Sequence, residues 1–182
     1  MGTLPHFGGW GIIVHNTPAT SGIVDLLQRS GPNMHIREAH LTEHRILEEL
    51  QMRASLGNAG DREALLANPN AVKIPLEQIS DGRLYVAELD ESIVGFAALE
   101  WRADGLAELD ALFVEPTLQR RGIGQSLVEH CVQVARLRGL TGLHVIGNPH
   151  ADRFYRACGF ESLGIVRTRF GDATSMRLTV SK

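Results

Sequence analysis

Hydrophobic and polar residues along the chain follow two periods, one typical of strands and one typical of helices. Alternation with a period of two begins at Met34–Glu38 and returns from Leu84 onward in short apolar runs. Asp104-Gly105 is a strong hairpin signal between two of these runs, so the strands on either side are predicted to be antiparallel. After Met34–Glu38, we expect strands at 84–88, 93–99, 106–114, 143–146, 161–168 and 174–180.

Two helical segments are predicted between the first strand and the second. Thr42 is expected to cap a helix, and Asp61 is expected to cap a shorter one that ends before Pro69. Pro75 is then expected to start a brief turn. The apolar face of the first helix is predicted to comprise Ile46, Leu47, Leu50 and Ala54.

Two further helices are predicted in the second half of the chain. One follows the strand 106–114 and carries a long amphipathic pattern, and the other is expected from about Pro149 to Cys158. The resulting order, β-α-α-β-β-β-α-β-α-β-β, predicts an α/β protein with a mixed, mostly antiparallel sheet flanked by helices. The apolar stripe of the longer helix is predicted to comprise Ile123, Leu127, Cys131, Val134 and Leu137.

Composition narrows the class of protein further. The 182 residues are 43% hydrophobic, enough for one domain with a proper core, and the net charge of −3 argues against a nucleic-acid surface. Residues 1–33 are rich in Gly, Pro, Ser and Thr, so we expect a loosely ordered extension before a domain at 34–182. With no apolar run of about 20 residues and no export leader, we expect a soluble cytoplasmic protein without a membrane partner.

The segment between the strand 106–114 and the long helix has the pattern of an anion site. Gln119-Arg-Arg-Gly-Ile-Gly124 follows the strand and opens the helix. The first N–H groups of a helix have no internal partner and face outward with the positive end of the helix dipole, so a phosphate is a natural ligand there. The spacing fits neither a Walker loop nor a dinucleotide fingerprint.

A second motif lies downstream of the strand 143–146. Asn148, Ala151, Tyr155, Gly159 and Phe160 fall on the pattern Asn-x-x-Ala-x-x-x-Tyr-x-x-x-Gly-Phe. Together with Gln/Arg-x-x-Gly-x-Gly/Ala at the helix start, this segment resembles the GNAT superfamily of acyl-CoA-dependent N-acyltransferases. The resemblance extends from Met34 to about Val180.

The resemblance implies a cofactor, acetyl-CoA, and a place for it. In the family the strand before the glycine turn parts from the strand after the helix, and the pantetheine arm inserts between them like another strand. The backbone of the first strand would pair with the arm, and the glycine turn would hold the pyrophosphate. The residues implied in cofactor binding are Leu112, Phe113, Val114, Gln119, Arg120, Arg121, Gly122, Ile123, Gly124, Gln125, Ser126, Asn148 and Tyr155.

The resemblance also implies two catalytic residues. Tyr155 matches the tyrosine that lies near the cofactor sulfur in many members, where it would act as the acid; the other interpretation is a core aromatic. Glu108 resembles the glutamate base of histone-modifying relatives, and the other interpretation is a partly exposed strand carboxylate. Asp110 would share the face of Glu108 unless a β-bulge intervenes, so Asp110 or water remains an alternative base.

The remaining candidate residues point to no further chemistry. His40 and His44 have a metal-like spacing, but no third ligand is apparent and we expect no metal site. His144 and His150 could line the cleft, although packed or exposed histidines are the favoured interpretation. Cys131 is expected to be a small buried hydrophobe on the long helix, and neither it nor Cys158 has the setting of a nucleophile.

The sequence therefore predicts an N-acetyltransferase that transfers acetyl from acetyl-CoA to a primary amine by direct attack in a ternary complex. The acceptor would be a small-molecule amine or a peptide or protein amine, and the resemblance is compatible with a homodimer. The alternative is a weak or inactive acyl-CoA-binding sensor or regulator.

Overall fold

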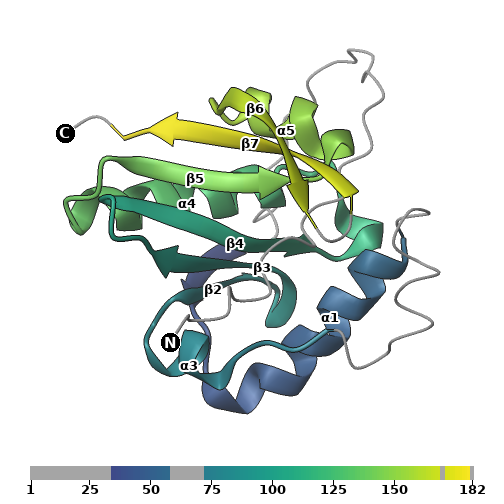
Figure 1. Ribbon diagram of the computed structural model, residues 1–182. Helices are drawn as coiled ribbons and strands as arrows, with labels where there is room; N and C mark the ends of the chain where they lie inside the picture. Colours follow the sequence, from purple (N-terminus) through teal and green to yellow (C-terminus); the bar gives the residue numbers. More distant parts are fainter. Residues whose placement is uncertain (1–33, 58–71, 169–170, 181–182) are drawn as a thin grey trace, which may run out of the picture.

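The computed structural model describes residues 34–57, 72–168 and 171–180, which form one seven-stranded sheet with helices on both faces (Figure 1). The strand order is β1-β2-β3-β4-β5-β7-β6, and every neighbouring pair is antiparallel except β4 and β5. This confirms the mixed, mostly antiparallel sheet. The strands are β1 Met34–Glu38, β2 Leu84–Leu89, β3 Ser92–Trp101, β4 Leu106–Val114, β5 Gly142–Gly147, β6 Glu161–Thr168 and β7 Gly171–Thr179.

The helices lie in two groups, one on each face of the sheet. Helix α4 passes behind the sheet in Figure 1, and α1 lies on the opposite side. Among the described residues, no helix combines the length and apolar content that crossing a bilayer requires. The helices are η1 Leu41–Glu43, α1 His44–Leu56, α3 Leu76–Ser80, η3 Pro116–Leu118, α4 Ile123–Leu137, η4 Pro149–Ala151 and α5 Asp152–Ala157.

Each face of the sheet has its own hydrophobic core, because successive side chains of a strand point to opposite faces. The core on the side of α1, which we call the α1 face, contains Leu47 and Leu50 against Phe96 and Phe113. The core on the side of α4, the α4 face, contains residues from β3, β4, β5, β7, α4 and α5. Its buried members include Leu99, Leu109, Leu112, Leu127, Cys131, Leu143, Val145, Tyr155 and Met176.

The start of the chain's first helix differs from the prediction. A 3-10 turn at Leu41–Glu43, with His40 as its N-cap residue, precedes α1, and Glu43 rather than Thr42 is the N-cap residue of α1. Ile46 is 48% exposed, so its place on the buried face was predicted wrongly, while Leu47, Leu50 and Ala54 are buried as expected. Pro75 does begin a short helix, α3. Residues 1–33 and the helix expected at Asp61 lie outside the described residues.

The buried stripe of α4 is also rotated from the predicted one. Ile123, Leu127 and Cys131 are buried, as expected, but the stripe continues through Val128 and Ala135. Leu137 is 88% exposed and Val134 is only partly buried, because in the last turns of the helix it is Ala135 that faces the core. The last predicted helix is divided into η4 and α5, with Asn148 as the N-cap.

Strands β4 and β5 are parallel but separate after a short paired stretch. Leu106–Glu108 pairs with Gly142–His144, and among the described residues no pairing between the two strands follows Glu108. Figure 1 shows the two strands drawing apart toward their carboxyl ends. From Leu109 onward β4 pairs, within the described part of the chain, with β3, so its other edge borders the space between β4 and β5, which we call the opening.

Gly142 begins β5 within the part that is paired with β4, and its replacement is predicted to destabilise the fold. A Cβ atom at Gly142 would lie 2.4 Å from the carbonyl oxygen of Leu178 in β7, so the two backbones must move apart. We expect Gly142→Ala to lower the free energy of unfolding by about 2–3 kcal/mol. Urea denaturation measures this loss, with the exposed Ser162→Ala as the control. An unchanged midpoint for Gly142→Ala would contradict the close approach.

Candidate active site

The glycine turn before α4 is held in an unusual backbone conformation. Arg120 has φ of 64° and Gly122 has φ of 84°, and Gly122 is the N-cap residue of α4. A non-glycine residue in the left-handed region costs about 1–2 kcal/mol, so the turn at Arg120 stores strain, a feature that clusters at functional sites. The first intrahelical bond runs from the Ser126 N–H to the Gly122 carbonyl at 2.9 Å. The preceding amides of the helix are therefore available to an anion.

The two glycines of the motif have different structural roles. Above Gly122 no described atom lies within 4 Å of a would-be Cβ, so its backbone is open to a ligand. A Cβ at Gly124 would lie 3.3 Å from Phe154 Cζ of α5, so Gly124 allows α4 and α5 to approach closely. The first glycine supports the proposed anion site, whereas the second is explained by packing alone.

The other predicted cofactor residues differ in what their side chains can reach. Arg120, Arg121 and Gln125 are exposed, Gln119 and Ser126 are partly buried, and Gln125 donates to Glu129 at 2.9 Å. The side chain of Ile123 is buried on the α4 face, so only its amide can meet a ligand.

The end of β4, which was predicted to contact the cofactor, offers backbone groups rather than side chains to a ligand. Leu112 and Phe113 are 1% and 4% exposed, and they point into opposite cores, while Val114 is partly buried. Their backbones pair with β3 on one edge and border the opening on the other. This arrangement fits an extended chain that adds to the sheet by main-chain hydrogen bonds.

Tyr155 lies deep in the core of the α4 face beside β5. Its ring is 1% exposed and packs edge-on against Phe154 and Phe160. A Cβ at Gly147 would lie 2.8 Å from Tyr155 Cε2, so the ring touches the backbone of β5 at its carboxyl end. Burial raises the pKa of Tyr155 well above its usual value, and the charges of Cys158 and Glu108 act in the same direction. The hydroxyl therefore remains protonated, so it can donate a proton or a hydrogen bond.

Glu108 is part of a polar group on the α1 face. Its Oε2 atom accepts a hydrogen bond from Arg102 Nη1 at 2.8 Å and lies 2.6 Å from His144 Nδ1. The other ring nitrogen of His144, Nε2, lies 2.8 Å from Ser175 Oγ. Burial acts to raise the pKa of Glu108, but the hydrogen bonds from His144 and Arg102 together lower it below the usual value. Glu108 is therefore ionised at neutral pH.

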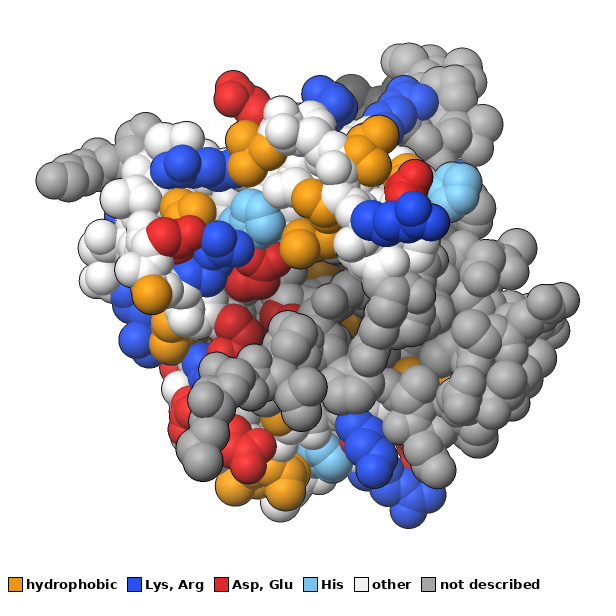
Figure 2. All heavy atoms as spheres, viewed as in Figure 1, with side chains coloured by type: hydrophobic (Ala, Val, Ile, Leu, Met, Phe, Trp, Pro, Cys, Tyr) orange, Lys and Arg blue, Asp and Glu red, His pale blue; other side chains and the backbone are white. Residues whose placement is uncertain are grey.

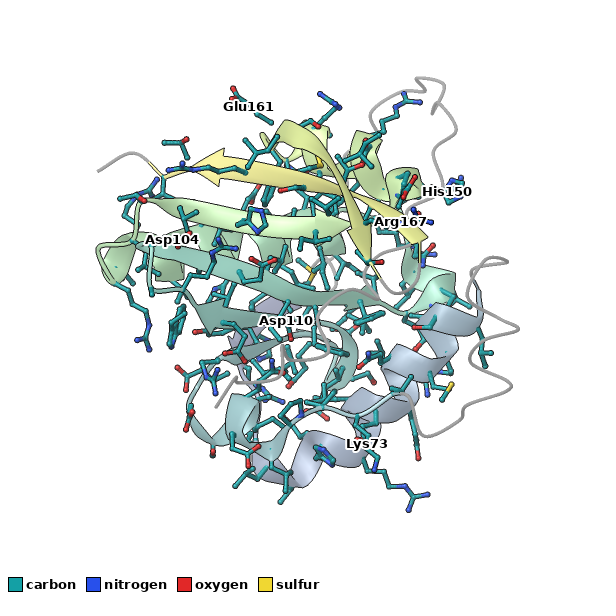
Figure 3. All side chains as sticks on the ribbon, in the orientation of Figure 1. Lys73, Asp104, Asp110, His150, Glu161 and Arg167 are labelled. Atoms are coloured by element: carbon teal, nitrogen blue, oxygen red, sulfur yellow. The ribbon has the colours of Figure 1, made fainter. Side chains whose placement is uncertain are left out.

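Asp110 occupies a β-bulge. The sequence analysis expected Asp110 to share the face of Glu108 unless such a bulge intervened. Ala98 pairs with Ala111 and Leu99 with Leu109, so Asp110 is the extra residue on β4. Its side chain still reaches the α1 face, where Gln78 Nε2 of α3 donates to Asp110 Oδ2 and to Glu100 Oε1, each at 2.8 Å. Figure 3 shows Asp110 at the middle of the sheet, and Figure 2 shows acidic side chains grouped beside a histidine on this face.

Asn148 and His150 have local structural roles at the end of β5. Asn148 caps η4, since its Oδ1 atom accepts a hydrogen bond from the His150 N–H at 3.0 Å. The side chain of His150 is exposed at the outer edge of the molecule (Figure 3). His44 Nε2 contacts the carbonyl of Ile74 at 2.8 Å, and within the described residues no group of three or more metal-ligating side chains occurs.

Both cysteines are poor nucleophiles in this structure. Cys131 is buried on α4, as predicted, and burial raises its pKa to about 12. Cys158 is partly buried after α5, and burial with the charge of Glu129 raises its pKa to about 11. Because the thiolate is the reactive form, neither group suits covalent catalysis at neutral pH.

The interactions of Glu108 predict a specific pH dependence of stability. Since the folded pKa lies below the unfolded value of about 4.3, the ion pair stabilises the protein above that pH. This stability is lost as pH falls through the folded pKa. We expect the free energy of unfolding to decrease less steeply below pH 5 in Glu108→Gln than in the wild type. Urea denaturation at several pH values measures this decrease, with Glu161→Gln as the exposed control. Equal slopes of unfolding free energy against pH in Glu108→Gln and the wild type would contradict the ion pair.

Comparison with known proteins agrees with this geometry. Residues 46–160 match the acetyltransferase (GNAT) family model. The chain is 35% identical over 101 residues to the peptidyl-lysine N-acetyltransferase YjaB of Salmonella typhimurium, and 32% identical over 101 residues to the uncharacterized N-acetyltransferase MJ1207 of Methanocaldococcus jannaschii. These matches cover 52% and 50% of this chain, and 65% and 44% of the two relatives. The chain thus spans less than two thirds of either curated relative.

Solved structures share the fold at lower sequence identity. The PaiA N-acetyltransferase of Thermoplasma acidophilum, in complex with coenzyme A, superimposes with a TM-score of 0.66 at 18% identity, over 81% of this chain and 99% of the other. The ribosomal-protein-S18-alanine N-acetyltransferase of Escherichia coli gives a TM-score of 0.62 at 21% identity, over 82% of this chain and 96% of the other.

The opened sheet and the glycine turn define the fold as that of an acyl-CoA-dependent N-acyltransferase. The family match extends over more than half of the chain. The chain belongs to the acetyltransferase (GNAT) family.

The sequence analysis did not identify several residues of the site. Gln78, Arg102 and Ser175 carried no recognised signal, although each contacts an acidic or histidine side chain of the site. His144 was favoured as an ordinary histidine, but it bridges Glu108 and Ser175. The period-two pattern could have placed Glu108 and His144 on polar strand positions, but it gives no strand register.

Proposed function

We propose that the protein transfers an acetyl group from acetyl-CoA to a primary amine by direct attack in a ternary complex. The observation that carries this proposal is the opening between β4 and β5, together with the glycine turn before α4. An extended arm and an anionic head group are the two parts that such a site accommodates. The absence of an activated thiol at Cys131 and Cys158 supports direct attack.

The proposed cofactor site combines the turn with the edge of β4 that borders the opening. Backbone groups from Leu112 to Val114 would pair with the pantetheine arm, and the amides between Gln119 and Gln125 would hold the pyrophosphate. The exposed guanidinium groups of Arg120 and Arg121 would add charge-assisted hydrogen bonds. Asn148 belongs to this proposal only through its position at the end of β5, since its Oδ1 atom already caps η4.

The proposed chemistry needs an acid for the leaving thiolate and a route for the amine proton. Tyr155 would serve the thiolate, because its protonated side chain lies against β5 at the edge of the opening. Glu108 would assist removal of the amine proton, because it is an ionised carboxylate at the closed end of the opening. A backbone N–H of the separated strand would stabilise the oxyanion.

The acceptor is proposed to be a cationic amine, carried by a small molecule, a peptide or a protein. Glu100, Glu108 and Asp110 place three carboxylates on the α1 face, next to the opening, and we call them the acidic surface. Arg83 pairs with Glu100, and Arg102 pairs with Glu108. Negative charge there attracts an ammonium group and raises its local concentration. The relative YjaB is named for peptidyl-lysine acetylation, and lysine is one such amine.

A single assay tests the proposed function. Thiol release from acetyl-CoA is measured with a panel of polyamines, amino acids, aminoglycosides and peptide amines, and acetylated product is confirmed by mass spectrometry. Amine-dependent release supports the transferase. Tight binding of coenzyme A in calorimetry without release across the panel would favour the sensor, and no binding of coenzyme A would refute both.

A further inference from the structure

Glu108, His144 and Ser175 form a continuous chain of hydrogen bonds across three strands, β4, β5 and β7. Glu108 Oε2 lies 2.6 Å from His144 Nδ1, and His144 Nε2 lies 2.8 Å from Ser175 Oγ. Glu108 and His144 are 36 residues apart in the sequence, and His144 and Ser175 are 31 apart, so only the sheet brings them together. His144 and Ser175 are 8% and 9% exposed, so their geometry is fixed by packing.

The proton positions within the chain follow from the partners. Nδ1 of His144 faces an ionised carboxylate, so Nδ1 carries a proton and donates a hydrogen bond to Glu108 Oε2. Arg102 Nη1 lies 3.1 Å from the same Nδ1 but can only donate, and its donor is directed to Glu108 Oε2 at 2.8 Å. In the neutral imidazole, Nε2 is then a free acceptor, and the Ser175 hydroxyl donates to it. The oxygen of Ser175 keeps two lone pairs for another donor.

All three side chains lie on the α1 face, at the end of the paired part of β4 and β5. Leu109, Val145 and Met176 are buried in the core of the α4 face, so the preceding residue of each strand points the other way. Glu108 and His144 are also the last paired residues before β4 and β5 separate. The chain therefore borders the closed end of the proposed acetyl-CoA opening, on the face that carries the acidic surface.

We propose that these three residues are the proton relay of the acetyl transfer, with Ser175 Oγ as the atom that contacts the acceptor nitrogen and His144 Nε2 as the proton acceptor. This inference rests on the proposed function. Glu108 then acts as a positioning residue, which holds the tautomer of His144 and stabilises the imidazolium. The arrangement uses the logic of an acid–histidine–hydroxyl triad to move a proton, without an acyl-serine.

Glu108 alone is a weaker choice of base than this chain. Its hydrogen bonds from Arg102 and His144 lower the pKa of the carboxyl, so a proton taken from an ammonium would be held poorly. His144 Nε2 accepts from the Ser175 hydroxyl, so it can take up a proton while Nδ1 keeps its contact with Glu108. The contacts of Glu108 with Arg102 and His144 both use Oε2, as expected for a carboxylate that orients a histidine.

The proton steps balance as follows. One N–H proton of the acceptor ammonium passes to Ser175 Oγ as the hydroxyl proton of Ser175 passes to His144 Nε2. The neutral nitrogen forms a bond to the thioester carbon, and the carbon–sulfur bond breaks. The leaving thiolate receives the second nitrogen proton by way of Tyr155, and His144 returns the first proton to solvent.

The test uses the full chain and an acceptor found in the amine panel. We expect Ser175→Ala and His144→Gln each to lower kcat about 100-fold. The KM for acetyl-CoA and the Kd for coenzyme A should remain unchanged, since neither side chain belongs to the proposed cofactor site. The double variant should lose no more than either single variant, because the residues act as one unit. Ser175→Thr restores a hydroxyl and should recover most of the rate.

The control is Thr174→Val, which removes a hydroxyl from the neighbouring residue on the opposite face of β7 without changing its size. Its kcat should equal that of the wild type. An active wild type with kcat retained in Ser175→Ala or His144→Gln overturns the relay alone. Acetylated Ser175 in protein quenched during turnover overturns it in favour of a nucleophile. A wild type that is inactive with every amine refutes the proposed function and the relay together.

Discussion

Replacement of Gly122 by Asp is expected to weaken coenzyme A binding by at least about 100-fold while leaving the protein folded. A carboxylate about 5 Å from a phosphate charge costs about 3 kcal/mol at an effective dielectric constant of 20, and 1.4 kcal/mol corresponds to a tenfold change in Kd. Asp is among the residues that best tolerate the positive φ at Gly122, and a negative charge at the start of α4 interacts favourably with the helix dipole. The fold should therefore survive.

Gly122→Asn is the matched control for this prediction. Asn has nearly the same shape as Asp and tolerates the same backbone conformation, but it carries no charge. We expect its Kd for coenzyme A to rise by no more than about tenfold. Isothermal titration calorimetry compares the two variants, and thermal unfolding checks that both are folded. Equal affinities for Asp and Asn would contradict a phosphate site at the start of α4.

Loss of the Tyr155 hydroxyl is expected to lower kcat about 100- to 1000-fold, the range of a general acid. Phe preserves the packing of the ring against Gly147, Phe154 and Phe160, so Tyr155→Phe removes only the proton donor. The Kd for coenzyme A should stay close to that of the wild type. Steady-state kinetics with the best acceptor, together with calorimetry, separates the two quantities.

Tyr85→Phe provides the control, because Tyr85 is a second buried tyrosine of the same core. Its hydroxyl donates to the Gly82 carbonyl at 2.9 Å, away from the opening, and burial raises its pKa to about 12. We expect Tyr85→Phe to lose about 1 kcal/mol of stability and to keep its kcat. If Tyr155→Phe also kept its kcat, Tyr155 would be a core aromatic, as in the other interpretation of the sequence.

Local features of the fold were predicted well from the sequence. The bounds of β4 and β6 agree with the prediction to the residue, because the Asp104-Gly105 turn and the period-two pattern act over a few residues. The glycine turn was recognised for the same reason, since the left-handed conformation at Gly122 is a property of one position.

The errors in the helices have a common physical cause. Ile46 and Leu137 are apolar and fall near helical spacing, yet they are 48% and 88% exposed. Which face of a helix is buried depends on the strands beneath it and on where the sheet ends. The spacing alone therefore could not choose between Leu137 and Ala135 on α4.

The sequence by itself determined the order of the strands, the glycine turn and the family, because each depends on residues close together in the chain. The tertiary structure decided how far β4 and β5 remain paired, that Asp110 occupies a bulge, and that Glu108, His144 and Ser175 meet. Strand register across 31 to 36 residues of sequence brings these three side chains within hydrogen-bond distance. Register is set by packing of the whole sheet, so no local pattern encodes it.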